Sequence, residues 1–167
     1  MSDQSLSHDE SMQEIGKIIK GVKFAMVTTQ NAEGHLHSRP LTTQEADFSG
    51  EIWFIGSKDS GSVADIKAHE RVNVSYSDAD KGQYVSLSGV AKLVEDRAKL
   101  EELWSDFYKA YFPQGIEDPN IQLIKVDASG AEFWEGDGKV KSFFHMARAA
   151  VTGKTADHQG KNETVKL

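Results

Sequence analysis

Short runs in which apolar and polar residues alternate cover most of the chain. Residues 24–29 are apolar and β-branched, residues 35–43 alternate, and turn-forming residues separate the two runs, so a β-hairpin is predicted. Further strands are predicted at 51–56, 71–76, 84–94, 121–126 and 131–134. Strands this short, joined by tight turns, favour an antiparallel barrel over a parallel sheet.

Apolar residues at helical spacing are confined to a few places. A capping box formed by Ser7 and Glu10 predicts the start of an N-terminal helix. The cap-forming residues 57–62 predict a short helix directly after a strand. In the segment 96–111 the large apolar residues fall on one helical face, so a single helix is predicted there.

Length and patterning fit one domain. A chain of 167 residues can bury one substantial hydrophobic core, and nothing in its length requires a second. We therefore expect a mainly β domain with peripheral helices at residues 1–152, followed by a polar C-terminal tail at 153–167. Residues 140–151 are predicted to form a last strand that runs into a short helix, and the tail from Gly153 is predicted to be loose.

Composition narrows the class of protein. The chain is 38% apolar and 27% charged, which is typical of a soluble globular protein. Its formal net charge of -7 disfavours binding to nucleic acid, which depends on clustered Lys and Arg at phosphates. The absence of Cys excludes disulfides and thiolate ligands. No apolar stretch is long enough for a transmembrane helix and residues 1–10 are polar, so we expect a cytoplasmic protein that does not bind membranes.

The segment 56–62 is the strongest candidate for binding an anion. A helix start that follows Gly and Ser residues offers unpaired backbone N–H groups and the positive end of the helix dipole. Lys58 adds a positive charge to the same segment. The alternative is that these residues only cap a connecting helix.

Arg39, Pro40 and Leu41 lie in a predicted strand, where proline cannot donate to a ladder and so marks an edge or a bulge. An edge leaves backbone groups free, and the pyrimidine side of a flavin ring needs such donors and acceptors. Arg39 can also reach a phosphate or a polar atom of the flavin ring. The alternative for a single arginine is a solvated position on the strand surface.

Aromatic and histidine residues offer weaker signals. Trp53, Trp104 and Trp134 can stack on a flat ligand, although tryptophans are more often core or interface residues. His35 and His37 share one face of a predicted strand, but no third ligand is near in sequence, so we predict no metal site.

Taken together, the segments resemble a known family. Residues 37–41 (HSRPL), 53–60 (WFIGSKDS) and 71–76 (RVNVSY) resemble the first half of the flavin-binding split barrels of the pyridoxamine-phosphate-oxidase-like superfamily. Residues 84–89 (YVSLSG), followed by Asp96–Lys99 and the Trp, Pro and Gly residues of 104–119, resemble its bacterial general stress protein branch. The resemblance covers roughly residues 12–153.

The resemblance implies a six-stranded antiparallel split β-barrel that forms a homodimer, with FMN, or alternatively FAD, bound between the subunits. The flavin ring and ribityl chain would lie along 39–42 and 54–56, and the phosphate would bind at 57–62. Either Trp104 or Trp134 of the second subunit would form one wall of the site. The cofactor-binding residues carried over in this way are Arg39, Pro40, Leu41, Thr42, Phe54, Ile55, Gly56, Ser57, Lys58, Ser60, Ser62, Trp104 and Trp134.

Two departures from the family pattern qualify the function that it implies. Many relatives have Lys where this chain has Ser62, and the true oxidases have Arg where it has Gly61, so phosphate binding would depend on Lys58. The closing Arg and His segment of the oxidases is not found, which argues against vitamin-forming oxidase activity. The remaining hypotheses are a flavin-dependent oxidoreductase acting on a small substrate, a non-catalytic flavin sensor or store, and a dimeric module with an empty cleft.

Overall fold

The computed structural model describes residues 6–136 and 161–167. The N-terminal helix forms where the capping box predicts it: the Ser7 backbone N–H donates to Glu10 Oε2 over 2.8 Å, and the Glu10 N–H donates to Ser7 Oγ over 3.3 Å. The elements follow one another as α1 (His8–Lys20), β1 (Phe24–Gln30), β2 (Leu36–Thr42), β3 (Glu51–Ser57), α2 (Gly61–Ala68), β4 (Arg71–Asp78), β5 (Gln83–Val94), α3 (Arg97–Leu103), η1 (Asp106–Ala110), η2 (Gly115–Glu117), β6 (Ile121–Glu135) and β7 (Lys161–Lys166).

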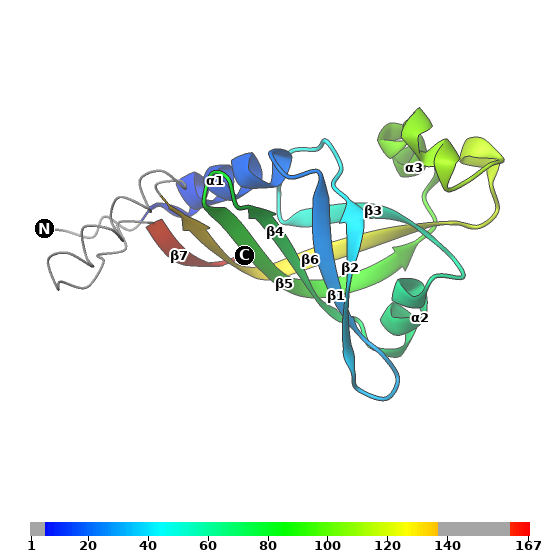
Figure 1. The fold of residues 1–167 in the computed structure, drawn as a ribbon, viewed down its shortest axis with the longest axis horizontal. Helices are drawn as coiled ribbons and strands as arrows, with labels where there is room; N and C mark the ends of the chain where they lie inside the picture. Colours follow the sequence, from blue (N-terminus) through cyan, green and yellow to red (C-terminus); the bar gives the residue numbers. More distant parts are fainter. Residues whose placement is uncertain (1–5, 137–160) are drawn as a thin grey trace, which may run out of the picture.

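The strands form one antiparallel sheet with the order β2-β1-β4-β5-β6-β3, and β7 pairs with β6 (Figure 1). The sheet coils until β2 and β3, the two ends of this order, come close to each other. Among the described residues no ladder joins β2 to β3, so the barrel stays open along this line. The structure confirms the predicted split barrel with peripheral helices. Six strands form the main order, as predicted, and β7 is a seventh strand beside β6.

The main core lies inside the coiled sheet and is closed at one end by α1. Alternation along β4 and β5 directs one side chain in two inward, as the sequence predicts, and Leu87 and Val74 are fully buried. α1 covers this core with Ile15, Ile18 and Ile19, which follow helical spacing. The position of α1 along one side of the sheet is visible in Figure 1.

The prediction of one continuous helix over 96–111 is wrong. α3 ends at Leu103, Trp104 has extended backbone angles, and the chain resumes as the 3₁₀ helix η1. The break lets Trp104 pack against Tyr108, with ring centroids 5.6 Å apart, over the smaller core around Ile55. Tertiary packing of the aromatic rings therefore overrides the helical pattern in this segment.

The C-terminal part of the sheet also differs from prediction. The two strands predicted at 121–126 and 131–134 are one strand, β6, which continues through a bulge opposite Gly89. The last residues of the tail are not loose, because 161–166 form β7 against β6. The prediction for 140–151 lies outside the described residues.

Candidate functional site

The site is built around Arg39, at the edge of the sheet where β2 passes α2. The Nη1 atom of Arg39 donates to Thr29 Oγ1 over 2.8 Å and to Asp65 Oδ2 over 3.0 Å. Thr29, which is fully buried at the end of β1, donates its own hydroxyl to Asp65 Oδ2 over 2.7 Å. We call Arg39, Thr29 and Asp65 the Arg39 cluster. It holds the guanidinium in one place, against the start of α2.

Asp65 is the buried carboxylate that accepts hydrogen bonds from both other members of the cluster. Its side chain is only 9% exposed, whereas that of Arg39 is 32% exposed. Burial opposes ionisation of the Asp65 carboxyl, but hydrogen bonds from Thr29 and Arg39 and the positive charge of Arg39 together hold its pKa below the usual range. The carboxylate is thus ionised at neutral pH, and Arg39 keeps part of its guanidinium accessible to a ligand.

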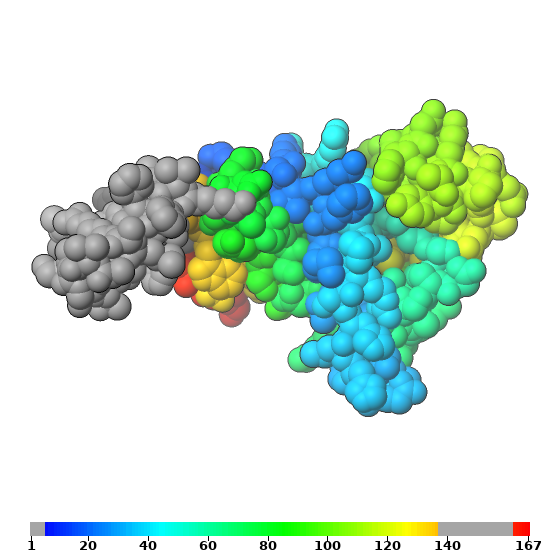
Figure 2. Space-filling model, in the orientation of Figure 1, coloured from blue at the N-terminus to red at the C-terminus, as the bar shows by residue number. Residues whose placement is uncertain are grey.

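Gly61 makes room for this arrangement. A Cβ atom at position 61 would lie 3.0 Å from Arg39 Nη2, which is closer than side chains normally approach. The guanidinium therefore occupies the space beside the first residue of α2 that a side chain would fill. The hairpin of β1 and β2 and the helix α2 lie against each other on the face shown in Figure 2.

The start of α2 adds hydrogen-bond donors next to Arg39. Ser60 is the N-cap and accepts from the Val63 N–H, and its hydroxyl lies 3.4 Å from the hydroxyl of Ser62. The N–H groups of Gly61 and Ser62 have no carbonyl within the helix to which they can donate. A guanidinium, hydroxyls and first-turn N–H groups at one corner form an arrangement suited to a phosphate.

Lys58 does not join this corner. Its exposed Nζ lies 3.6 Å from Glu95 Oε1, and its backbone N–H donates to the carbonyl of Asn120 over 2.8 Å. Ser57 donates to Asp59 Oδ1 over 2.6 Å, and the Asn120 amide bonds to both Ser57 and Asp59. The structure thus directs Lys58 toward the loop that follows β5, and it brings Arg39 to the helix start.

The two strand segments expected beside the flavin ring lie on the edge strands. Pro40 is exposed on β2 opposite Met26 of β1, which confirms that the proline marks an edge. Leu41 and Thr42 are half-buried, while Phe54 and Ile55 are buried in the main and the smaller core. Phe54 can therefore meet a ligand only through its main chain.

The two candidate tryptophans lie apart. Trp104 packs on Tyr108 and Phe112 beside Ile55, whereas Trp134 pairs with Tyr84 near the opposite end of β6. Ile121, thirteen residues before Trp134, pairs with Ser57, so the two ends of β6 are separated by roughly 40 Å along the strand. One chain alone does not bring Trp134 to the Arg39 cluster.

Thr29, Asp65 and Asn120 were missed by the sequence analysis. Thr29 and Asp65 are 36 positions apart in the chain, and nothing in their local pattern marks them as partners of Arg39. Their proximity results from α2 packing across the end of β1. The only local hint was that Asp65 is a charged residue between the buried Val63 and Ile66 of a short helix.

Two further features were sought among the described residues: a cluster of metal-binding side chains and a helix that could span a membrane. Within 6–136 and 161–167, no group of three or more His, Cys, Asp or Glu side chains lies together. His37, one of the two histidines considered for a metal, places its Nδ1 3.3 Å from Arg39 Nη2. None of the helices in the same part of the chain has the length and apolar character needed to span a membrane.

The fold is that of an open split barrel, and at its edge the guanidinium of Arg39 lies beside the first turn of α2. Residues 10–157 match the sequence model of the pyridoxamine 5'-phosphate oxidase like family, and the chain belongs to that family. A curated relative, Protein bli-3 of Neurospora crassa, is 27% identical over 168 residues, which cover 92% of this chain and 79% of the relative.

Solved structures agree with this assignment. A protein described as general stress protein 26 from Jannaschia sp. CCS1 aligns with a TM-score of 0.76 and 27% identity, over 96% of this chain and 100% of its own. A protein described as the general stress FMN/FAD binding protein of Xanthomonas citri aligns with a TM-score of 0.67 and 30% identity, over 76% and 89% of the two chains. The resemblance seen in the sequence is thereby confirmed.

Proposed function

We propose that this protein binds a flavin, with FMN as the preferred form, and that the FMN phosphate binds at the Arg39 cluster and the start of α2. The observation that carries the proposal is the fixed guanidinium of Arg39 beside Gly61, held by Asp65 and Thr29. Bound FMN would supply redox chemistry, while the protein residues bind and orient it.

Arg39 offers a reason why the departures at Gly61 and Ser62 are compatible with phosphate binding. The true oxidases carry an arginine at the position of Gly61, and here the guanidinium of Arg39 lies 3.0 Å from where a Cβ at 61 would be. We infer that a guanidinium from β2 serves in place of one from the helix start. Lys58, paired with Glu95, then contributes less than the sequence alone implied.

The hydrogen-bond donors at Arg39 and the start of α2 favour FMN over FAD. A phosphate monoester carries roughly two negative charges and three acceptor oxygens, which matches donors that converge from Arg39, Gly61 and Ser62. The linked phosphates of FAD are diesters and present fewer free oxygens at any one corner. The relative from Xanthomonas citri, described as FMN/FAD binding, supports a flavin site in this fold.

We expect wild-type protein to bind FMN at least about tenfold more tightly than riboflavin. The two ligands differ only in the phosphate, and a single charge-assisted hydrogen bond is worth about 1.5 to 3 kcal/mol. Titration of each flavin, followed by its fluorescence, measures both affinities. Equal affinities would show that the start of α2 is a plain helix cap and would refute the proposed phosphate site.

We further propose that the protein forms a homodimer through the outer face of the sheet. Phe24, Met26 and Tyr84 are 45%, 41% and 40% exposed on β1 and β5. Trp134 pairs directly with Tyr84, so it lies on the same face. Such an exposed apolar surface is typical of a protein interface. In such a dimer the partner copy would supply the Trp134 side chain that one chain alone does not bring to the Arg39 cluster.

Light scattering after size-exclusion chromatography is expected to give twice the chain mass of 18.4 kDa. Burial of roughly 2,000 Å² is usual for a stable interface. Met26→Glu, which places a charge on the outer face, should yield monomers. The matched control Lys67→Glu places a carboxylate at an exposed position of α2 and should leave the dimer intact. A monomeric wild type at micromolar concentration would refute the shared flavin site.

Catalysis and storage are two hypotheses about what the bound flavin does. Reduction of the bound flavin by a nicotinamide nucleotide, with turnover on an added acceptor, would support a flavin-dependent oxidoreductase. Stable binding without turnover would support a sensor or store. Both hypotheses require the same Arg39 cluster, so loss of binding on its disruption tests what they share.

A further inference from the structure

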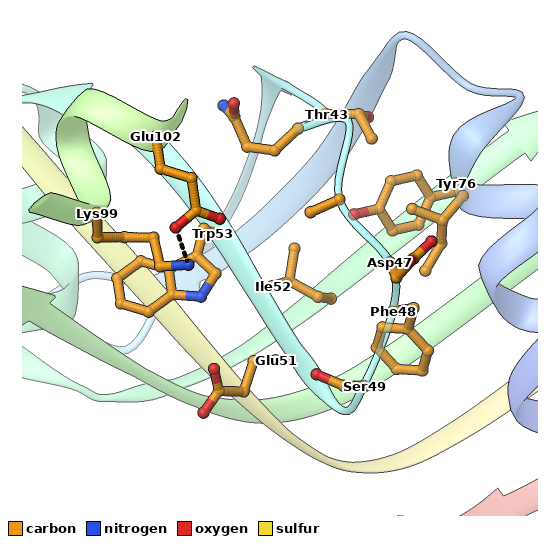
Figure 3. A pocket seen from close by; sticks show the side chains of 13 residues that line it. Thr43, Asp47, Phe48, Ser49, Glu51, Ile52, Trp53, Tyr76, Lys99 and Glu102 are labelled. Atoms are coloured by element: carbon orange, nitrogen blue, oxygen red, sulfur yellow. Dashed lines mark hydrogen bonds and ion pairs between the residues drawn. The ribbon is translucent and has the colours of Figure 1, made fainter. Parts of the chain in front are cut away.

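A cavity lies beside the barrel, between the loop that joins β2 to β3, the strand β3 and the helix α3 (Figure 3). Its volume is about 220 Å³. Liquid water occupies about 30 Å³ per molecule, so the space holds roughly seven waters or one substituted six-membered ring. Its lining shares no residue with those that we assign to the flavin.

Two hydroxyl groups at this cavity are buried without a partner. Tyr76 is 1% exposed, and within the described residues neither its hydroxyl nor Thr43 Oγ1 has a hydrogen-bond partner. Burial raises the pKa of the Tyr76 hydroxyl far above its usual range, so this group stays protonated and can donate. A buried donor without an acceptor is costly, so its presence at this cavity needs an explanation, and a bound group is one of them.

The remaining walls are apolar and their charges are paired. Phe48, Ile52 and Trp53 line the cavity, and Figure 3 shows Tyr76 and Trp53 on opposite sides of Ile52. Each of the three lining carboxylates has a lysine partner: Glu102 pairs with Lys99 at 2.8 Å, Glu51 with Lys125 at 2.7 Å, and Asp47 with Lys20. The lining thus offers neither an uncompensated charge for an ionic ligand nor a fully apolar wall.

We propose that this cavity binds a small, neutral, cyclic molecule with a carbonyl oxygen, which accepts a hydrogen bond from the Tyr76 hydroxyl. The ring lies among Phe48, Ile52 and Trp53, and Thr43 meets a second polar atom of the ligand. A carboxylate would be excluded, because burying it without a free cation is costly. The site is independent of the flavin site in its residues and in its chemistry.

Three probes of similar size separate the contributions: acetophenone, which is neutral with a carbonyl, ethylbenzene, which lacks the oxygen, and benzoate, which is charged. Each is titrated into isotope-labelled protein as purified, followed by NMR at the Trp53 indole N–H and the Ile52 methyl groups. Acetophenone is expected to give saturable shifts and to bind about fivefold more tightly than ethylbenzene, as one net hydrogen bond implies. Benzoate is expected to give no saturable shift.

Tyr76→Phe removes only the hydroxyl and keeps the ring in the core. It should bring the affinity for acetophenone down to that for ethylbenzene, whereas the control Tyr111→Phe, at an exposed position, should leave both unchanged. No saturable binding of acetophenone, or equal affinity of wild type and Tyr76→Phe, would overturn the proposal and leave a cavity filled by water. Repeating the titration with saturating FMN keeps this result separate from the fate of the flavin site.

Discussion

Replacing Gly89 with alanine is expected to cost more than about 3 kcal/mol of stability, and the variant is expected to be folded poorly or not at all. A Cβ atom at this position would lie 2.3 Å from the carbonyl oxygen of Asp127 and 2.9 Å from the Cα of Ala128. Both are backbone atoms of β6, so no side chain can rotate away to relieve the clash. Overpacking usually costs about 1 to 3 kcal/mol, and larger values are expected where only the backbone can move.

Gly130→Ala is the matched control, because Gly130 lies next to the same bulge on the facing strand. The nearest atom to a Cβ there is the Val165 carbonyl oxygen at 3.7 Å, an ordinary contact. This variant should lie within about 1 kcal/mol of wild type, since alanine also lowers the entropy of the unfolded chain. Urea unfolding followed by circular dichroism measures both, and a Gly89→Ala variant as stable as Gly130→Ala would contradict the close approach of β5 to β6.

Arg39→Gln is expected to weaken FMN binding roughly ten- to a hundredfold while riboflavin binding changes little. Loss of charge-assisted hydrogen bonds worth about 1.5 to 3 kcal/mol in total accounts for that range. Riboflavin has no phosphate for Arg39 to meet, so the effect should be specific to FMN. Lys58→Ala should weaken FMN binding less, because Lys58 is exposed and lies beside Glu95.

Two controls separate the phosphate contact from a general loss of structure. Arg71→Gln removes one positive charge from an exposed side chain of β4 and should leave both affinities unchanged. Combining Arg39→Gln with Asp65→Asn avoids leaving a buried carboxylate without its cation, and it should recover stability but not FMN affinity. If Arg39→Gln weakened both flavins equally, Arg39 would have a structural role and the phosphate would bind elsewhere.

The Arg39 cluster and the bulge opposite Gly89 both depend on how separate segments pack together in the coiled sheet. The cluster depends on α2 packing over the end of β1, and the bulge lets β5 and β6 stay paired while the sheet coils. The same coiling brings the edge strands β2 and β3 close together, and these carry the segments that we assign to the flavin ring. The proposed site is therefore a product of sheet curvature, which no single segment contains.

The sequence by itself determined most of the elements and the family. Alternating runs and apolar, β-branched runs bounded by turns predicted β1 to β5 close to their observed bounds. Ser7 and the cap-rich segment 57–62 predicted where α1 and α2 begin. Pro40 marked an edge strand, because proline cannot donate to a ladder. These signals are local: they depend on backbone geometry and on which face of one segment is apolar, so they can be recognised without knowing what lies opposite.

Only the tertiary structure decided which residues meet. The pairing of Arg39 with Asp65 and Thr29, and of Lys58 with Glu95, joins residues far apart in the chain, so spacing could not assign Arg39 rather than Lys58 to the start of α2. Aromatic packing on the smaller core ended the helix at Leu103, and the bulge opposite Gly89 made one strand of two predicted ones. The energies that settle these choices come from contacts between segments, and a linear pattern does not contain them.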